Sequence, residues 1–242
     1  MIAHRGASEE APENTLAAFR LAWEQEADGI EGDFHLTKDN RIDDSSTKRV
    51  AQKDLKIAES TLEDLKKLDV GSWKGAKWAG EEIPTLEEVP ATVPLGKKIY
   101  IEIKCGSEMI PKLTEVLQAA QVLKEQTIIM SFDEDIVAKS KKALPDRTVL
   151  LLVDFEADRA TGQMVPNLED VMMALEATQA DGIASNTVST KMLQAIIQVR
   201  KTLHVWTVND PKIAPALAQA GAASIITDRP GLILKAIREA GK

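Results

Sequence analysis

Apolar and polar residues follow two different patterns along the chain. Short runs rich in β-branched residues are typical of buried strands, whereas longer segments with a repeated apolar face are typical of amphipathic helices. The strand-like runs are Met1–His4, Gly29–Phe34, Lys98–Lys104, Thr127–Ser131, Thr148–Val153, Gly182–Ser185, Leu203–Val208 and Ala223–Thr227. Helix-like segments follow most of them, namely Asn14–Gln25, Glu108–Ala120, Glu134–Ala143, Leu168–Ala177, Thr190–Lys201, Pro211–Ala220 and Pro230–Ala240.

Strands that alternate with helices in this way are typical of β-α units repeated around a parallel sheet. Eight alternations within 242 residues favour a closed (β/α)8 TIM barrel over an open sheet. Barrels of this kind reach such lengths as one domain. We therefore expect a single α/β barrel domain over residues 1–242.

One connection between these elements is longer than the others. It runs roughly from Lys38 to Pro84, between the second strand and a helix expected to start near Thr85, and it contains a charged helix-like stretch, Leu62–Leu68. Loops of this length inside a compact domain are usually functional or fold as a small unit of their own. We expect residues 38–84 to form an inserted segment that caps the barrel mouth.

The composition is that of an ordinary soluble globular protein, with 44% apolar and 28% charged residues. A formal net charge of −8 argues against a nucleic-acid partner, which would require a clustered basic surface. No apolar stretch approaches the length that spans a bilayer, and the chain starts without the pattern of a signal peptide. The expected location is the cytoplasm, or the outside for a mature form whose leader has been removed; the oligomeric state is left open.

Residues at the carboxyl ends of the strands build the chemistry of a barrel. This rule selects His4, Arg5, Glu31, Asp33, Glu102, Lys104, Ser131, Phe132, Trp206 and Asn209. Glu31 and Asp33 are two residues apart, so both side chains leave the same face of one strand. Together with Glu102 they form an oxygen-rich set that suits one hard divalent cation, Mg²⁺ or Ca²⁺, rather than zinc. Arg5 and Lys104 would supply the positive charge that a phosphate requires.

Seven short motifs contain these residues and follow one another along the chain. They are Ile2-Ala3-His4-Arg5-Gly6, Pro12-Glu13-Asn14-Thr15, Gly29-Ile30-Glu31-Gly32-Asp33, Ile101-Glu102-Ile103-Lys104, Ser131-Phe132, Val205-Trp206-Thr207-Val208-Asn209 and Thr227-Asp228-Arg229-Pro230. In this order, and over essentially the whole chain, they resemble the glycerophosphodiester phosphodiesterase family. The resemblance implies a barrel with a small insertion after the second strand. It also implies that a small-molecule glycerophosphodiester is hydrolysed to glycerol phosphate and an alcohol.

The resemblance further implies roles for the charged residues. The single divalent cation would be held by Glu31, Asp33 and Glu102. Arg5 and Lys104 would contact the phosphate of the substrate.

The same resemblance makes His4 one of two acid/base histidines and Glu13 a supporting polar residue near it. Trp206 would form a wall of the substrate pocket rather than part of the core. Asn14, which precedes a predicted helix, is most simply the N-cap of that helix.

The chain departs from the family pattern at one place. In the family, a turn resembling Lys38-Asp39-Asn40 is followed by a short apolar strand that ends in His-Asp and brings the second catalytic histidine. Here Arg41-Ile42 leads straight into Asp43-Asp44-Ser45-Ser46, so a few residues are missing, the histidine among them. A single apolar residue before a polar run cannot make a buried strand. Either the chain lacks this segment or the sequence as written omits residues that the protein carries.

The two remaining histidines, His35 and His204, are expected to have different roles. His35 lies two residues beyond Asp33 and is either a replacement for the missing histidine or a supporting residue, whereas His204 begins a strand at the end opposite the mouth and is expected to be structural. Acid/base catalysis contributes about 10²–10⁴-fold, so loss of one partner predicts slow, cation-assisted turnover. The alternative is a catalytically silent barrel that binds glycerophosphodiesters or anions. A third hypothesis is a sibling activity on lysophospholipids or sphingolipids, with release of a cyclic phosphate.

Overall fold

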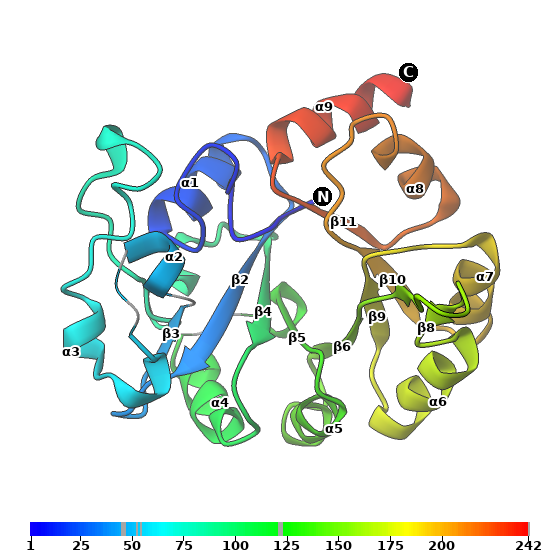
Figure 1. Ribbon diagram of the computed structural model, residues 1–242, viewed down its shortest axis with the longest axis horizontal. Coiled ribbons are helices and arrows are strands. Elements are labelled where there is room, and N and C mark those ends of the chain that lie inside the picture. Colours follow the sequence, from blue (N-terminus) through cyan, green and yellow to red (C-terminus); the bar gives the residue numbers. More distant parts are fainter. Residues whose placement is uncertain (45–46, 52, 54, 121–122, 242) are drawn as a thin grey trace.

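The computed structural model describes residues 1–44, 47–51, 53, 55–120 and 123–241. In this part of the chain eight parallel strands close into a barrel, because β1 pairs with both β2 and β11 (Figure 1). Around the ring the strands are β1 (Ile2–Ala3), β2 (Gly29–Leu36), β4 (Lys98–Ile103), β5 (Thr127–Ser131), β6 (Thr148–Val153), β9 (Gly182–Ser185), β10 (Thr202–Val205) and β11 (Ser224–Thr227). The predicted TIM barrel is confirmed.

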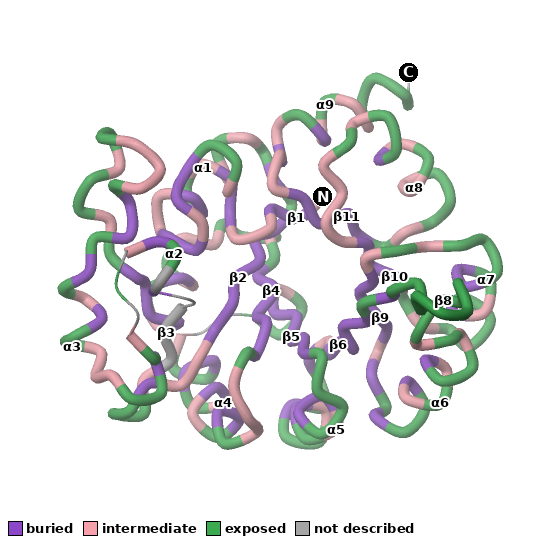
Figure 2. The backbone as a smooth tube through the Cα atoms, in the orientation of Figure 1, coloured by how far each residue is buried: buried purple, intermediate pink, exposed green. Residues whose placement is uncertain are grey.

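Helices surround the ring of strands. In chain order they are α1 (Leu16–Glu24), α4 (Met109–Ala119), α5 (Glu134–Ala143), α6 (Leu168–Thr178), α7 (Thr190–Gln198), α8 (Ala214–Ala220) and α9 (Pro230–Ala240). Each helix turns an apolar stripe toward the strands; in α7 that stripe is Met192, Leu193 and Ile196. Buried residues therefore concentrate in the strands and on the inner faces of the helices, as Figure 2 shows.

The inside of the barrel is filled rather than hollow. Inward-facing apolar side chains form one cluster, consisting of Ile2, Tyr100, Ile128, Met130, Leu150, Leu152, Ala184 and Ile226. These positions alternate along the strands with side chains that pack against the helices, as the pleat of a strand requires. A ligand can therefore enter only above this layer, at the mouth formed by the carboxyl ends of the strands.

The inserted segment contains short elements and its own apolar cluster. The elements are β3 (Ile42–Asp44), α2 (Thr47–Ala51), η1 (Ile57–Glu59), α3 (Leu62–Leu65) and η2 (Ala76–Trp78). The buried cluster consists of Val50, Ile57, Leu65, Leu68, Val70 and Ile83. The segment also touches the barrel, because Lys74 Nζ donates to the carbonyl of Ser8 at 2.7 Å. Its role as a cap stays a prediction.

The structure corrects the prediction of a helix near Thr85. The backbone turns after Thr85 and continues into a short 3-10 helix, η3 (Pro90–Thr92). Pro90 has no N–H to continue an α-helical hydrogen-bond ladder from the preceding turn, so an α-helix does not propagate.

The region of the missing histidine forms a short hairpin. Strand β3 pairs antiparallel with β2, with Leu36 opposite Ile42 and Phe34 opposite Asp44. A strand therefore forms where the polar sequence argued against a buried one, although the side chains of Ile42–Asp44 are not described and their burial is untested. Ser45 and Ser46 lie outside the described residues.

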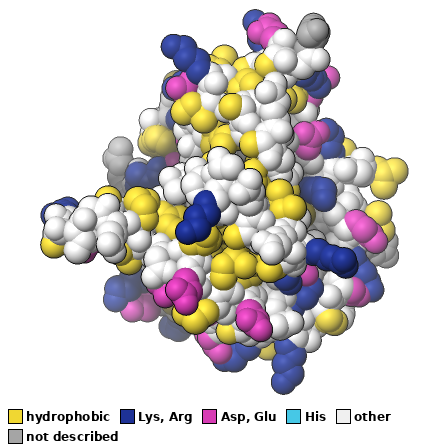
Figure 3. Space-filling model, turned by 90° about the vertical axis from the view of Figure 1, so that its right-hand side faces the viewer, with side chains coloured by type: hydrophobic (Ala, Val, Ile, Leu, Met, Phe, Trp, Pro, Cys, Tyr) yellow, Lys and Arg dark blue, Asp and Glu magenta, His cyan; other side chains and the backbone are white. Residues whose placement is uncertain are grey.

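Two smaller elements complete the fold, η4 (Lys124–Gln126) and a hairpin of β7 (Glu156–Ala157) and β8 (Met164–Val165). The side of the molecule that carries α6, α7 and α8 faces the reader in Figure 3, where hydrophobic side chains gather between scattered charges. Exposed Met173 and Ile197 belong to these helices. Within the described chain, no helix has both the length and the apolar character needed to cross a membrane.

Candidate active site

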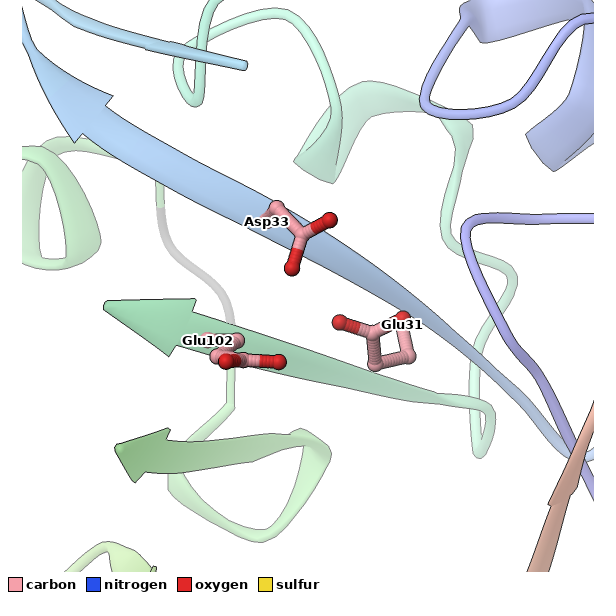
Figure 4. Close-up of side chains that lie close together, drawn as sticks. All are labelled: Glu31, Asp33 and Glu102. Carbon is pink, nitrogen blue, oxygen red and sulfur yellow. The ribbon is translucent and has the colours of Figure 1, made fainter. Parts of the chain in front are cut away.

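Three buried carboxylates meet at the barrel mouth. Glu31 and Asp33 come from β2 and Glu102 from β4, and the parallel register places Asp33 directly beside Glu102. Each side chain offers one oxygen, and these oxygens lie within 4.8 Å of one another, as the convergence in Figure 4 illustrates. Their exposed fractions are only 0% for Glu31, 2% for Asp33 and 6% for Glu102, so solvent screens their mutual repulsion poorly.

The cluster is a group of carboxylates that could hold a cation. Burial, reinforced by the charge of Asp33, raises the pKa of Glu31 well above its usual range. The buried oxygen Glu31 Oε1 accepts no hydrogen bond from the described residues, and buried acceptors without partners are costly. Three converging carboxylates with such an unpartnered oxygen fit one hard divalent cation, and the predicted assignment of these residues as its ligands stays a prediction.

Two cationic side chains lie against the same cluster. Lys104 Nζ is 2.5 Å from Glu102 Oε1 and 3.2 Å from Asp33 Oδ1. Arg5 Nε is 2.9 Å from Asp33 Oδ2. Burial opposes ionisation of Asp33, but the charges of Arg5 and Lys104 outweigh it and lower the pKa of Asp33. Fixed positive charge thus stands where the sequence predicted phosphate contacts, although the phosphate role itself stays a prediction.

The backbone at Arg5 is part of this arrangement. Its φ of 55° lies in the left-handed region, which costs a non-glycine residue about 1–2 kcal/mol. In this conformation the Arg5 N–H donates to Glu31 Oε2 at 2.9 Å while the guanidinium reaches Asp33. One residue therefore contacts two of the three carboxylates.

His4 lies beside the carboxylates and is held by an aspartate from the far end of the chain. Its Nδ1 is 2.7 Å from Asp228 Oδ1, and its Nε2 is 3.9 Å from Glu31 Oε2. Burial disfavours the charged imidazolium, but the hydrogen bond to Asp228 and the charge of Glu31 outweigh it, so the pKa of His4 is raised above 6.5. With Nδ1–H donated to Asp228, Nε2 remains directed toward the carboxylate cluster.

Asp228 is itself oriented by neighbours in the loops that follow β1 and β10. Asn209 Nδ2 donates to Asp228 Oδ2 at 2.6 Å, and Ser8 Oγ donates to Asp228 Oδ1 at 2.9 Å. Burial would raise the pKa of Asp228, but the hydrogen bonds from His4 and Asn209 help to lower it to about 2. Asp228 belongs to the motif Thr227-Asp228-Arg229-Pro230, but no role was predicted for it from the sequence. Its position after the last strand of a barrel, next in the ring to the strand of His4, was the available signal.

The two supporting residues behave differently from each other. Glu13 accepts a hydrogen bond from the guanidinium of Arg5 at 2.7 Å. It also forms an ion pair with Arg49 of the inserted segment. Asn14 is not the N-cap of α1. Thr15 fills that position, because its side chain accepts from the Ala18 N–H. The left-handed φ of 56° turns Asn14 away from the helix, and its amide donates to Asp33 Oδ2 at 3.2 Å.

Two cavities open on either side of His4 and Arg5. A polar one of about 360 Å³ is lined also by Ser8, Glu9, Glu13, Asn209, Asp228 and Arg229. A smaller one of about 170 Å³ contains Glu102 and Lys104 and has an apolar wall that includes Phe132 and Trp206. The rings of Phe132 and Trp206 pack edge to face with centroids 5.8 Å apart. Trp206 thus lines a pocket at the mouth and also touches the interior cluster.

The other two histidines lie outside these cavities. His204 is buried at the opposite end of the barrel, where Ser224 Oγ lies 2.8 Å from its Nδ1 and Thr202 Oγ1 lies 3.1 Å from its Nε2. This is the structural position that the sequence predicted. His35 is on β2, beyond Asp33, and burial lowers its pKa.

The mouth of this closed β/α barrel carries an acidic cluster, two positively charged side chains and a histidine–aspartate pair, and the active sites of such barrels lie at this end of the strands. Residues 4–232 match the Glycerophosphoryl diester phosphodiesterase family. The chain belongs to this family of phosphoric diester hydrolases.

Individual relatives agree with the family match. A glycerophosphodiester phosphodiesterase of Caldanaerobacter subterraneus subsp. tengcongensis is 34% identical, with 100% of this chain and 98% of that protein covered. The solved structure of an Oleispira antarctica phosphodiesterase in complex with the product sn-glycerol-3-phosphate is 28% identical, has a TM-score of 0.86 and covers 98% of this chain and 96% of its own. The structure of a Thermotoga maritima glycerophosphodiester phosphodiesterase is 28% identical, with a TM-score of 0.77 and coverages of 97% and 96%.

Proposed function

We propose that this protein hydrolyses small glycerophosphodiesters to glycerol phosphate and an alcohol, with one divalent cation, Mg²⁺ or Ca²⁺. The observation that carries the proposal is the position of His4: its Nδ1 is tied to Asp228 and its Nε2 faces the buried carboxylates, 3.9 Å from Glu31. An imidazole nitrogen beside the carboxylates and two positively charged side chains supplies the proton acceptor and the charge stabilisation that phosphodiester hydrolysis can use. The product complex of the Oleispira relative supports the same substrate class.

The cation would be held by Glu31, Asp33 and Glu102, whose donor oxygens converge. When bound, it supplies positive charge that polarises the phosphate. Arg5 and Lys104 line the cavity that also contains Glu102. There they would contact the non-bridging oxygens of the phosphate. They also neutralise charge that develops on phosphorus-bound oxygens during attack.

His4 moves the proton in this mechanism. As the neutral imidazole with its proton on Nδ1, it accepts a proton at Nε2 from the attacking group; as the imidazolium, it returns a proton to the leaving alkoxide. Asp228 stabilises the charged form through the 2.7 Å contact with Nδ1. Glu13 accepts a hydrogen bond from Arg5 and so positions its guanidinium.

A single histidine must perform both proton transfers unless His35 shares them. We therefore propose that turnover is slow compared with an enzyme that carries two such histidines, by a factor within the roughly 10²–10⁴-fold that acid/base catalysis contributes. The same gap supports the alternative function, a barrel that binds glycerophosphodiesters without hydrolysing them.

The decisive experiment is turnover by the purified chain after its intact mass has been measured. A panel of glycerophosphodiesters is incubated with EDTA and then with restored Mg²⁺ or Ca²⁺, and products are identified by phosphorus NMR. Cation-dependent release of glycerol phosphate that disappears in His4→Ala supports the proposal. Binding without turnover supports the silent barrel, release of a cyclic phosphate supports the sibling activity, and a mass above that of the printed sequence shows that the missing residues exist.

A further inference from the structure

The inserted segment reaches the active site through one arginine. Arg49 lies on α2, and its guanidinium donates to both carboxylate oxygens of Glu13, Nη1 to Oε2 and Nη2 to Oε1. The side chain of Glu13 is only 9% exposed and lines the polar cavity beside His4. Arg49 itself lines neither of the two cavities at the mouth. Any effect of Arg49 on a substrate must therefore pass through Glu13.

Glu13 connects Arg49 to Arg5. Its Oε1 accepts from Nη1 of Arg5 at 2.7 Å as well as from Arg49. Burial opposes ionisation of Glu13, but the hydrogen bonds and charges of the two guanidinium groups outweigh it and lower the pKa of Glu13. Arg5 is thus held at two points, by Glu13 at Nη1 and by Asp33 at Nε. Its guanidinium is the group expected to contact the phosphate, so its orientation matters for the reaction.

The fold of the inserted segment fixes the backbone that carries Arg49. Thr47 Oγ1 donates to the carbonyl of Leu55 at 2.8 Å and accepts from the N–H of the same residue at 2.9 Å. Val50, the residue after Arg49, is buried in the apolar cluster of the segment. Arginine presents a planar pair of donors that matches a carboxylate, so an arginine on a fixed backbone holds its partner in one orientation. The contact with Glu13 thus joins two ordered parts of the protein.

A second contact joins the inserted segment to the same loop of the barrel. Glu13 and Ser8 both belong to the connection between β1 and α1, which also carries Arg5. Lys74 Nζ donates to the backbone carbonyl of Ser8 at 2.7 Å. That contact reaches only the main chain, whereas Arg49 binds a side chain that in turn binds Arg5. Of the two contacts, the one from Arg49 can set the orientation of a substrate-binding group.

We propose that Arg49 is a positioning residue for the hydrolysis: through Glu13 it fixes the guanidinium of Arg5 at the phosphate. The proposal rests on the proposed function and extends it to a residue of the inserted segment. Charge that is already in place stabilises a transition state well, because it needs no reorganisation during the reaction. Without Arg49, Glu13 loses a contact that fixes it, and Arg5 loses its fixed orientation. The phosphate site is thus complete only when the inserted segment is docked on the barrel.

A double-mutant cycle tests this route. Arg49→Gln is expected to lower kcat/KM on a glycerophosphodiester at saturating cation by roughly 5- to 100-fold, since misplacing a group by about 1 Å can cost about 10²-fold. In the Glu13→Gln background the same substitution should cost less than about twofold more, because the route through Glu13 is already broken. A full loss from Arg49→Gln in both backgrounds overturns the proposal, and so does an unchanged kcat/KM in Arg49→Gln alone.

Two further variants separate positioning from the general docking of the segment. Arg41→Gln is the matched control, because Arg41 is also in the inserted segment, is 43% exposed against 50% for Arg49, and pairs with Glu87 at 3.3 Å. Neither Arg41 nor Glu87 lines a cavity at the mouth, so kcat/KM should stay within about twofold. Arg49→Lys keeps the charge but not the paired donors, so its kcat/KM should lie between those of Arg49→Gln and the wild type. An equal loss in Arg41→Gln and Arg49→Gln argues against the route through Glu13 and overturns the assignment.

Failure of the proposed function gives a different result from failure of this positioning role. If the wild type hydrolyses no diester, calorimetric titration with sn-glycerol-3-phosphate and the cation replaces kinetics for the four proteins of the cycle. Weaker binding in Arg49→Gln than in the wild type, with no such difference in the Glu13→Gln background, supports the positioning role in a barrel without turnover. Equal binding by the wild type and Arg49→Gln overturns it. A wild type that neither hydrolyses diesters nor binds glycerol phosphate refutes the proposed function, and the role of Arg49 with it.

Discussion

Replacing Asp228 by Asn tests whether Asp228 determines which ring nitrogen of His4 carries the proton. In the wild type, Asp228 receives hydrogen bonds on both oxygens, from His4 Nδ1 at 2.7 Å and from Asn209 Nδ2 at 2.6 Å. An asparagine has one acceptor oxygen and one donor nitrogen. If the oxygen stays toward Asn209, the new amide donates to His4 Nδ1 and moves the histidine proton to Nε2. The lone pair of His4 is then on Nδ1, which faces residue 228 and not the carboxylates. His4 can therefore no longer accept the proton of the nucleophile.

The structure also sets the size of the effect. A hydrogen bond to an ionised carboxylate contributes about 1.5–3 kcal/mol, and Asp228 stabilises the imidazolium by such a bond. Since about 1.4 kcal/mol corresponds to a factor of ten in rate, kcat should fall by roughly 10- to 150-fold in Asp228→Asn. KM should change by less, because Asp228 does not line the cavity that contains Lys104.

Steady-state kinetics on a glycerophosphodiester at saturating cation, together with thermal unfolding, check this result. Ser8→Ala is the matched control, because Ser8 donates to the same oxygen, Oδ1, but does not touch the imidazole in the hydrogen-bond network. It should lower kcat by less than Asp228→Asn does, because it removes one donor to the carboxylate and leaves the contact between Asp228 and His4 in place. An unchanged kcat in Asp228→Asn, or an equal loss in Ser8→Ala, would refute the reasoning.

Three further predictions concern the cation, the fold and the remaining histidine. Added Mg²⁺ or Ca²⁺ should raise the melting temperature of the wild type but not of Glu31→Gln, because an ion at 100 times its Kd stabilises the native state by about 2.7 kcal/mol; the same rise in both proteins would contradict the assigned ligands. Burial lowers the pKa of His204 to about 4, below the 6.5 of the unfolded chain, so the unfolded state takes up the proton first as the pH falls. Urea unfolding should therefore show a loss on the order of 2–3 kcal/mol from this group between pH 7 and 4.5, and His204→Gln should have a smaller loss over that interval. His35→Ala should reduce kcat by less than about tenfold, because His35 lines neither cavity beside His4; a loss within the roughly 10²–10⁴-fold range of acid/base catalysis would make His35 the replacement for the missing histidine.

Elements with a strong local pattern were predictable from sequence alone. Strands β5, β6 and β9 and helices α5 and α9 have the predicted bounds, because the strand and helix periods are visible in a short window of residues. The acidic cluster followed from the same local rule. Glu31 and Asp33 share a face of one strand, and barrel topology brings the end of the next strand in the ring beside it.

Tertiary structure decided which side chains meet across long sequence separations. Asp228 lies 224 residues from His4 and contacts it only because β1 pairs with β11 when the barrel closes. The polar side chain of Asn14 was predicted to cap its own helix, yet a left-handed backbone turns it toward Asp33 and leaves the cap to Thr15. Local patterns determine secondary structure because they depend on neighbours along the chain. The partners of a buried charge depend on neighbours in space, and here ring closure and single backbone conformations determine those neighbours.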